Sequence, residues 1–265
     1  MAQTTGPVQP ATALGQPGRL WLGTSGFNYP HWRGRFYPAD LPPSRWLAFY
    51  ARHFAAVELN VTFYRLPTAE AFSRWAESVP ESFRFVLKGS LFITHIKHLS
   101  GCEDPLGQLL ERASRLGGRL EAIVWQLPPR FSVNVGRLEA FLELLRRHPL
   151  AGRVRHAFEF RDESWFEALV MQLLAQHNAA VVMADWPFRD RKVEPTANWV
   201  YIRRHGPGAP YADSYPERML AADARAIREW LQAGRDVFCF FNNDVGGHAA
   251  YDALRLRELV AAHRQ

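Results

Sequence analysis

The chain has 265 residues, of which 48% are hydrophobic and 22% are charged, values that are ordinary for one large globular domain. It contains no apolar run of about 18 residues, which excludes a membrane-spanning helix. Its two cysteines, Cys102 and Cys239, exclude a disulfide framework and a thiolate metal cluster, so we expect a reducing, cytoplasmic location.

The net charge of +6 and the isoelectric point of about 9.6 raise nucleic acid or anionic substrates as partners. Only three of the 32 basic residues are lysines (Lys88, Lys97 and Lys192), and the 29 arginines are spread along the predicted helices. No block of five or more basic residues occurs, which is typical of solvated helix faces. Nucleic acid is therefore not the favoured partner.

Residues 1–18 lack both a basic start and an apolar core, so we expect a disordered tail rather than a secretory signal. Eight apolar runs then predict strands, at 19–25, 56–60, 84–90, 122–127, 156–162, 179–185, 199–206 and 236–244. Helical spacing predicts helices between most of them, at 44–54, 68–79, from Asp104, at 138–148, 165–177 and 222–233, and from Gly246 to Ala262. Ser44 and Thr68 are the expected caps of the first two helices. Residues 186–198 carry no helix signal.

Strict alternation of strands and helices, with strands of the buried parallel type, predicts a single (β/α)8 TIM-type barrel over residues 19–265. Irregular loops are expected after strands 1, 3, 6 and 7. An open doubly wound sheet is the alternative. It would need a glycine-rich phosphate turn after the first strand, and the stretch Gly23–Gly26 is a weak match to one.

Polar residues gather at the carboxyl end of nearly every predicted strand, and in a barrel these ends share one mouth. The predicted catalytic residues are Glu58, Lys88, Glu159 and Asp185. The predicted substrate-binding residues are Asn60, Tyr64, Gln126, Arg161, Arg203, His205, Asn242, Asn243 and Asp244. A functional pocket explains this one-sided placement, and a salt-bridge network that only holds the barrel together is the alternative.

These residue types allow several chemistries. Glu159 and Asp185 lie on neighbouring strands and suit an acid/base pair. Lys88, Arg161 and Arg203 suit a phosphate or carboxylate, and Lys88 also suits a base or a Schiff-base amine. No metal ligand set is assigned: zinc favours several histidines, whereas magnesium or manganese on Glu58, Glu159, Asp185 or Asp244 stays open. No motif for an organic cofactor is found.

Seven stretches in order carry a resemblance to a known family. They are Gly23–Gly26 with Tyr29 and Trp32, Val57–Tyr64, Phe85–Lys88 with Thr94 and His95, Trp125–Pro129, Phe158–Arg161 with Ser164 and Trp165, Tyr201–Gly206, and Phe241–Asp244 with Ala249. Together they resemble the YecE-like family, number seventy-two in the series of domains of unknown function. The resemblance implies a TIM-type barrel. It implies no activity and no catalytic residues.

The mixture of cations and carboxylates at one mouth favours an enzyme acting on a small, polar, anionic substrate, such as a phosphorylated or carboxylated sugar derivative, by carboxylate acid/base chemistry. Metal-dependent cleavage of phosphodiesters in nucleic acid is one alternative. A non-catalytic small-molecule binding protein is another. We expect no membrane partner, and a monomer is favoured.

Overall fold

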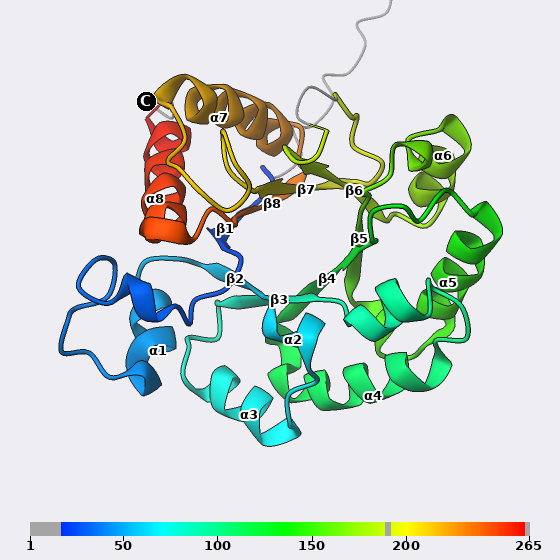
Figure 1. Ribbon diagram of the computed structural model, residues 1–265, viewed down its shortest axis with the longest axis horizontal. Coiled ribbons are helices and arrows are strands. Elements are labelled where there is room, and N and C mark those ends of the chain that lie inside the picture. Colours follow the sequence, from blue (N-terminus) through cyan, green and yellow to red (C-terminus); the bar gives the residue numbers. More distant parts are fainter. Residues whose placement is uncertain (1–16, 189–191, 263–265) are drawn as a thin grey trace, which may run out of the picture.

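The computed structural model describes residues 17–188 and 192–262, so the predicted tail at 1–18 lies outside the described residues except for Pro17 and Gly18. Eight parallel strands follow one another around a single sheet in the order β1-β8-β7-β6-β5-β4-β3-β2. Helices surround this sheet, as Figure 1 shows. The predicted (β/α)8 barrel is confirmed.

The strands are β1 (Leu20–Thr24), β2 (Ala56–Leu59), β3 (Arg84–Lys88), β4 (Leu120–Gln126), β5 (Arg155–Glu159), β6 (Ala180–Ala184), β7 (Trp199–Arg204) and β8 (Asp236–Phe241). The α-helices are α1 (Trp46–Tyr50), α2 (Val61–Tyr64), α3 (Ala69–Glu77), α4 (Glu103–Ala113), α5 (Val135–Arg147), α6 (Ala168–Gln176), α7 (Glu217–Gln232) and α8 (His248–Ala261). Short 3-10 helices are η1 (Pro30–Trp32), η2 (Pro43–Arg45), η4 (Ser114–Arg119), η5 (Ala151–Arg153), η6 (Glu163–Trp165) and η7 (Val245–Gly247), and η3 (Phe92–Ile96) is a π-helix.

The inner face of the barrel pairs small side chains with large ones. Alanines on β2, β4, β5 and β6 lie in one buried cluster with aromatic residues of β7 and β8, among them Trp199, Tyr201 and Phe238. Because side chains alternate along a strand, the residues of this cluster are spaced two apart where a strand contributes more than one. The interior is therefore filled by side chains, and polar groups enter it only where each strand ends.

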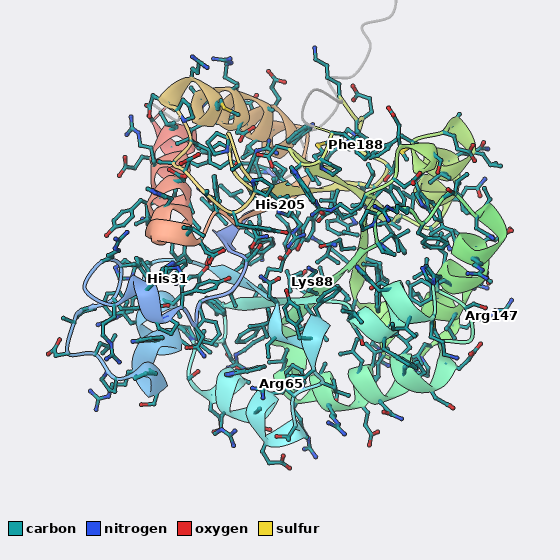
Figure 2. The ribbon with its side chains drawn as sticks, viewed as in Figure 1. His31, Arg65, Lys88, Arg147, Phe188 and His205 are labelled. Atoms are coloured by element: carbon teal, nitrogen blue, oxygen red, sulfur yellow. The ribbon has the colours of Figure 1, made fainter. Side chains whose placement is uncertain are left out.

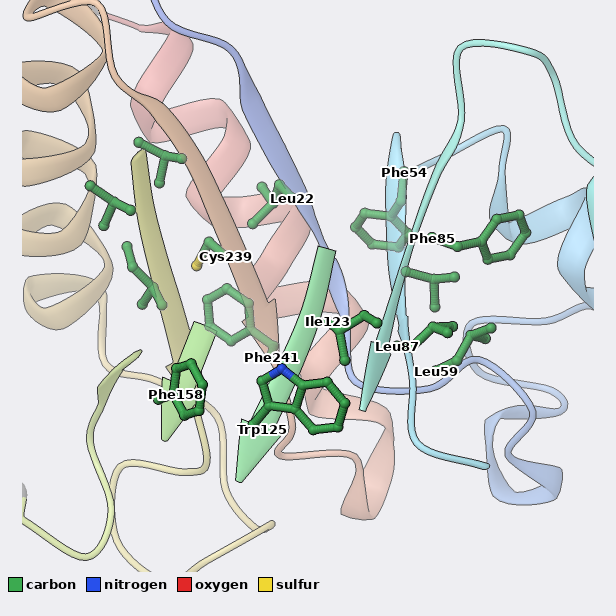
Figure 3. Close-up of a cluster of buried hydrophobic side chains, with 14 of the residues drawn as sticks. Leu22, Phe54, Leu59, Phe85, Leu87, Ile123, Trp125, Phe158, Cys239 and Phe241 are labelled. Carbon is green, nitrogen blue, oxygen red and sulfur yellow. The ribbon is translucent and has the colours of Figure 1, made fainter. Parts of the chain in front are cut away.

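The opposite faces of the strands form the larger core, packed against the helices. Figure 3 shows part of it, with Leu59, Leu87 and Ile123 side by side and Trp125 and Phe158 close by. These residues alternate with the inward-facing ones along the same strands. The two cores thus fix which side of each strand faces the barrel axis.

The barrel closes between β1 and β2 at a narrow seam. The amide of Gly26 donates to the carbonyl of Glu58 at 2.7 Å. The hydroxyl of Tyr50, from α1, lies between the two strands, where it accepts from the Thr24 amide at 2.7 Å and donates to the Ala56 carbonyl at 3.2 Å. Gly23 passes so close that a Cβ there would lie 2.1 Å from the Ala56 oxygen.

Some predicted boundaries were wrong. Each of the eight predicted strands extends past the observed strand end, by one to three residues. Ser44 lies inside η2 and does not cap α1, whereas Thr68 does cap α3 by accepting from the Ala71 amide. The helix α2 was not predicted.

Within its described residues, the segment from 185 to 198 contains no helix, as predicted. In Figure 1 the neighbouring helices α6 and α7 flank this loop. A groove of about 670 Å³, lined by Met183, Trp230 and other residues, lies at this position.

We predict that Gly23→Ala destabilises the fold by about 2–3 kcal/mol, because the new methyl group overlaps backbone that cannot move without opening the seam. The midpoint of urea unfolding measures the effect. Gly107→Ala is the matched control: it lies inside α4, with its nearest neighbour 4.0 Å away, and should be neutral or stabilising by about 0.5–1 kcal/mol. Equal effects of the two substitutions would contradict this account of the seam.

Candidate active site

A sealed ionic layer lies at the carboxyl ends of β2, β5 and β7. Arg203 is fully buried, and its guanidinium bridges two carboxylates: Nη2 donates to Glu58 Oε1 at 2.6 Å, and Nη1 donates to Glu159 Oε2. The hydroxyl of Tyr201 donates to the other oxygen of Glu58 at 2.6 Å. Glu58 and Glu159 are also fully buried. Since its terminal nitrogens bind these two acids, Arg203 lies inside the barrel beneath the mouth and has no contact with solvent.

The charges in this layer hold one another in the ionised state. Burial alone would raise the pKa of Glu159, but the positive charges of Arg161 and Arg203 outweigh it and hold that pKa well below the ordinary value. Burial alone would likewise lower the pKa of Arg203, but Glu159 and Glu58 raise it. Glu159 is therefore a permanent carboxylate near neutral pH, which suits it to positioning cations and not to donating a proton.

A second group of buried side chains lies two residues beyond Glu159 and Arg203, just past the ends of β5 and β7. Arg161 pairs with Glu159, donates to the Trp186 carbonyl at 3.1 Å, and stacks over the Trp186 ring at 4.3 Å. His205 Nε2 lies 3.3 Å from Glu159 Oε1, and His205 Nδ1 lies 3.1 Å from the amide nitrogen of Asn242. Nε2 of His205 also lies 3.1 Å from Arg161 Nη2. Burial lowers the pKa of His205, which favours its neutral ring.

Asp185 joins the end of β6 to the loop that follows β7. One carboxylate oxygen accepts from the His205 amide at 2.8 Å, and the other accepts from the Tyr215 hydroxyl. The same hydroxyl accepts from the Gly206 amide at 2.6 Å. One oxygen of Asp185 thus binds the backbone of His205 directly. The other is linked to the backbone of Gly206 through the Tyr215 hydroxyl.

Lys88, at the end of β3, differs from the other cations. Its side chain is 8% exposed, and Nζ lies 4.0 Å from the centroid of the Phe63 ring. No carboxylate within the described parts of the chain forms an ion pair with it. Burial and the charge of Arg203 lower the pKa of Lys88 to about 7, although the charges of Glu159 and Glu58 oppose the shift. In Figure 2, Lys88 and His205 both lie toward the centre of the ring of strands.

The remaining predicted residues are divided between the mouth and its surroundings. Gln126 ends β4 in register with Glu159, and the Asn60 amide donates to the Ser25 carbonyl at 3.0 Å across the seam. Asp244 lies beside His31, at 3.7 Å. Tyr64 is 76% exposed on α2, so its contact with a substrate stays a prediction.

Two predicted substrate-binding residues are fully buried and hydrogen-bonded within the fold. Arg203 lies in the sealed layer, as described above. Asn243 is fully buried, and its amide donates to the Asp213 carbonyl and to Asp252 Oδ2, each at 2.7 Å. It therefore fastens α8 to the loop after β7, because its neighbour Asn242 takes the inward position and alternation turns Asn243 outward.

Sequence reasoning missed two aromatic rings that hold the cations, Phe63 under Lys88 and Trp186 under Arg161. Trp186 directly follows the predicted Asp185, and that adjacency was an available signal. His95 was also left out of the predicted site. Its ring packs on Phe63 at 5.0 Å, and burial, together with the charge of Lys88, lowers its pKa to about 4. His95 is thus a neutral wall of the site.

Among the described residues, no three histidine, cysteine, aspartate or glutamate side chains are grouped to hold a metal ion. The oxygens of Glu58 and Glu159 instead face arginine and tyrosine donors. Separately, none of the described helices has the length and apolar character needed to cross a membrane.

The chain was compared with known proteins. A family model described as "Protein of unknown function DUF72" matches residues 21–265. The curated protein YunF of Bacillus subtilis, named a UPF0759 protein, is 25% identical over 91% of this chain and 94% of its own length. The UPF0759 protein YecE of Escherichia coli K12 is 36% identical, over 44% of this chain and 42% of its own.

A solved structure shares the fold. A DUF72 family protein from Thermotoga maritima superposes with a TM-score of 0.80 at 27% identity, over 92% of this chain and 99% of the other. The predicted resemblance to the YecE-like family is confirmed.

We predict that Arg203→Met costs about 3–5 kcal/mol of stability, because it leaves Glu58 and Glu159 buried without their shared cation. Urea unfolding at neutral pH gives the measurement. Arg255→Met is the control, since its ion pairs with Glu217 and Glu258 are exposed, and its cost should be much smaller. A small effect at Arg203 would show that the sealed layer does not support the barrel.

We predict that Lys88→Met stabilises the protein by about 2–3 kcal/mol at pH 6, because methionine removes an ammonium that burial disfavours. Between the folded pKa of about 7 and the ordinary value of 10.5, the unfolded chain binds more protons, so the stability of the wild type rises with pH. The difference in stability between Lys88→Met and the wild type should therefore decrease as the pH rises from 7 to 10.5. Thermal midpoints from pH 6 to 10 measure it.

Lys192→Met serves as the control, since Lys192 is exposed. It should give no such pH trend. An advantage of Lys88→Met that stays constant from pH 6 to 10 would mean that Lys88 keeps its ordinary protonation in the fold.

Proposed function

This chain belongs to the DUF72 family of proteins of unknown function, and we propose from its barrel mouth that it is an enzyme acting on a small, polar, anionic substrate, such as a phosphorylated or carboxylated sugar derivative, by acid/base chemistry. The observation that carries the proposal is Lys88. It is a cation at the mouth, nearly buried, that the fold does not neutralise with an acid.

The preference for an anion follows from the charges around Lys88. In the sealed layer and at Arg161, two arginines alternate with two glutamates, so this group is balanced. Protonated Lys88 adds a positive charge to it in a site of low dielectric, where a ligand of opposite charge is strongly favoured. Arg161 offers a second contact, because its guanidinium is planar and slightly exposed above Trp186.

The proton-transfer role falls to Lys88 and not to the carboxylates that the sequence suggested. A group transfers protons best when its pKa is close to the working pH, and the pKa of Lys88 is about 7. The low pKa of Glu159 and the two hydrogen bonds of Asp185 suit these acids to positioning Arg161 and His205.

We predict that phosphate and sulfate raise the thermal midpoint of the wild type along a saturating curve, because an anion that binds the folded state stabilises it. Lys88→Met should lose most of this shift, whereas Lys192→Met should keep it. Equal shifts in all three proteins would mean a general salt effect and would contradict the anion site.

Turnover is tested by proton exchange. The wild type is incubated in D2O with a panel of small phosphorylated and carboxylated sugars, and NMR follows loss of their C–H signals. Exchange that depends on Lys88 is the expected result. Saturable binding of a sugar without exchange or any other turnover would favour a non-catalytic binding protein.

A further inference from the structure

We infer that Lys88 is a nucleophile and that the substrate carries an aldehyde or ketone carbonyl, whose carbon forms an imine with Lys88 Nζ. The inference rests on the proposed function and deepens it, because it narrows a small anionic substrate to a small anionic carbonyl compound. It is carried by the position of the Lys88 amine relative to its neighbours.

The nitrogen of Lys88 is not committed to the fold. The terminal nitrogens of both arginines already have partners. Those of Arg203 contact Glu58 and Glu159. Those of Arg161 contact Glu159, His205 and the Trp186 carbonyl. Among the described residues, Nζ of Lys88 has the Phe63 ring as its close neighbour, at 4.0 Å. An ammonium or an iminium is accepted by such a ring face. The nitrogen therefore stays available for a new bond.

The backbone that carries Lys88 is firmly held. The Thr62 hydroxyl, at the start of α2, donates to the Lys88 carbonyl at 2.7 Å and also to the Leu59 carbonyl at 2.8 Å. The next residue, Gly89, donates its amide to the Val124 carbonyl at 2.8 Å. A fixed backbone and a nearly buried residue hold the amine in place over the Phe63 ring, and such positioning suits covalent catalysis by lysine.

The amine must also be neutral to attack. Burial and the charge of Arg203 keep a substantial fraction of Lys88 unprotonated near neutral pH. The positive charges of Arg161 and of any remaining protonated Lys88 would attract the anionic group of a substrate. A carbonyl compound that carries a carboxylate or phosphate thus meets a cation for its anionic end and a free amine for its carbonyl carbon.

The step balances without an external oxidant or reductant. The Nζ lone pair forms a bond to the carbonyl carbon, and the electron pair of the C=O π bond moves to oxygen, which takes a proton and gives a carbinolamine. Nitrogen supplies that proton and loses its second one as its lone pair forms the C=N bond, the C–O bond breaks, and the oxygen leaves as water carrying both protons. The product is an imine. Once protonated, it restores the positive charge that Glu159 and Glu58 favour at this position.

The experiment traps this imine. The full chain is incubated at pH 7.5 with glyoxylate or pyruvate and sodium cyanoborohydride, which reduces an imine to a stable secondary amine, and peptide mass spectrometry maps the product. The chain offers three lysines, so Lys97 and Lys192 are internal controls. Lys88 should be modified at least about tenfold faster than either, because an ordinary lysine is almost wholly protonated at this pH. Its rate should rise through pH 7 and saturate with ligand.

Lys88→Met should lose the fast modification and keep the slow background. A neutral carbonyl of similar size, acetone, should react with Lys88 more slowly than pyruvate. Equal rates at the three lysines, or none at Lys88, overturn the inference. If phosphate still stabilises the protein through Lys88 in that case, the proposed function stands and only the imine fails. Fast trapping at Lys88 by both carbonyls alike, without any anion effect, supports the nucleophile and removes the anionic part of the proposal.

Discussion

The bridge from Glu58 through Arg203 to Glu159 is the interaction on which the mouth of this barrel depends. Three charges lie fully out of solvent, and the cost of burying them is offset by their mutual attraction, by the Tyr201 hydroxyl and by the ion pair of Glu159 with Arg161. Glu159 then extends the network to Arg161. The bridge joins β2, β5 and β7, so it couples the charge state of the site to the closure of the barrel.

Lys88 lies beside this balanced group and breaks the rule that a buried cation has an acid partner. The fold accepts an amine whose charged form is disfavoured, and such costs are characteristic of functional positions, where a reactive group is retained at the expense of stability. The amine lies over the Phe63 ring, and the neutral ring of His95 packs on Phe63, so neither side chain supplies a negative charge to balance the ammonium. The protonation of Lys88 in such a site changes with the charge of a bound ligand and with pH near 7.

Much of the fold was predictable because its local signals agree. The predicted strands match β1 to β8, and the missing helix after β6 was visible as a run without helical spacing. The errors lie at strand ends. Alternation of inward and outward residues continues beyond the ladder, so Arg161 was assigned to a strand that stops at Glu159. Alternation reports which way a side chain faces, whereas a strand ends where the backbone hydrogen bonds to its neighbour end.

By itself, then, the sequence determined the barrel and the gathering of polar residues at the carboxyl ends of its strands, because period two and the order of elements are local properties of the chain. Only the tertiary structure decided depth and partners. Arg203 is sealed because it meets Glu58, 145 residues away, while Asn243 turns outward to Asp252. Lys88 keeps a free amine because no acid among residues 17–188 and 192–262 forms an ion pair with it. Charge balance depends on which residues meet across the closed barrel, and the sequence of one strand holds no information on the side chains that face it from another.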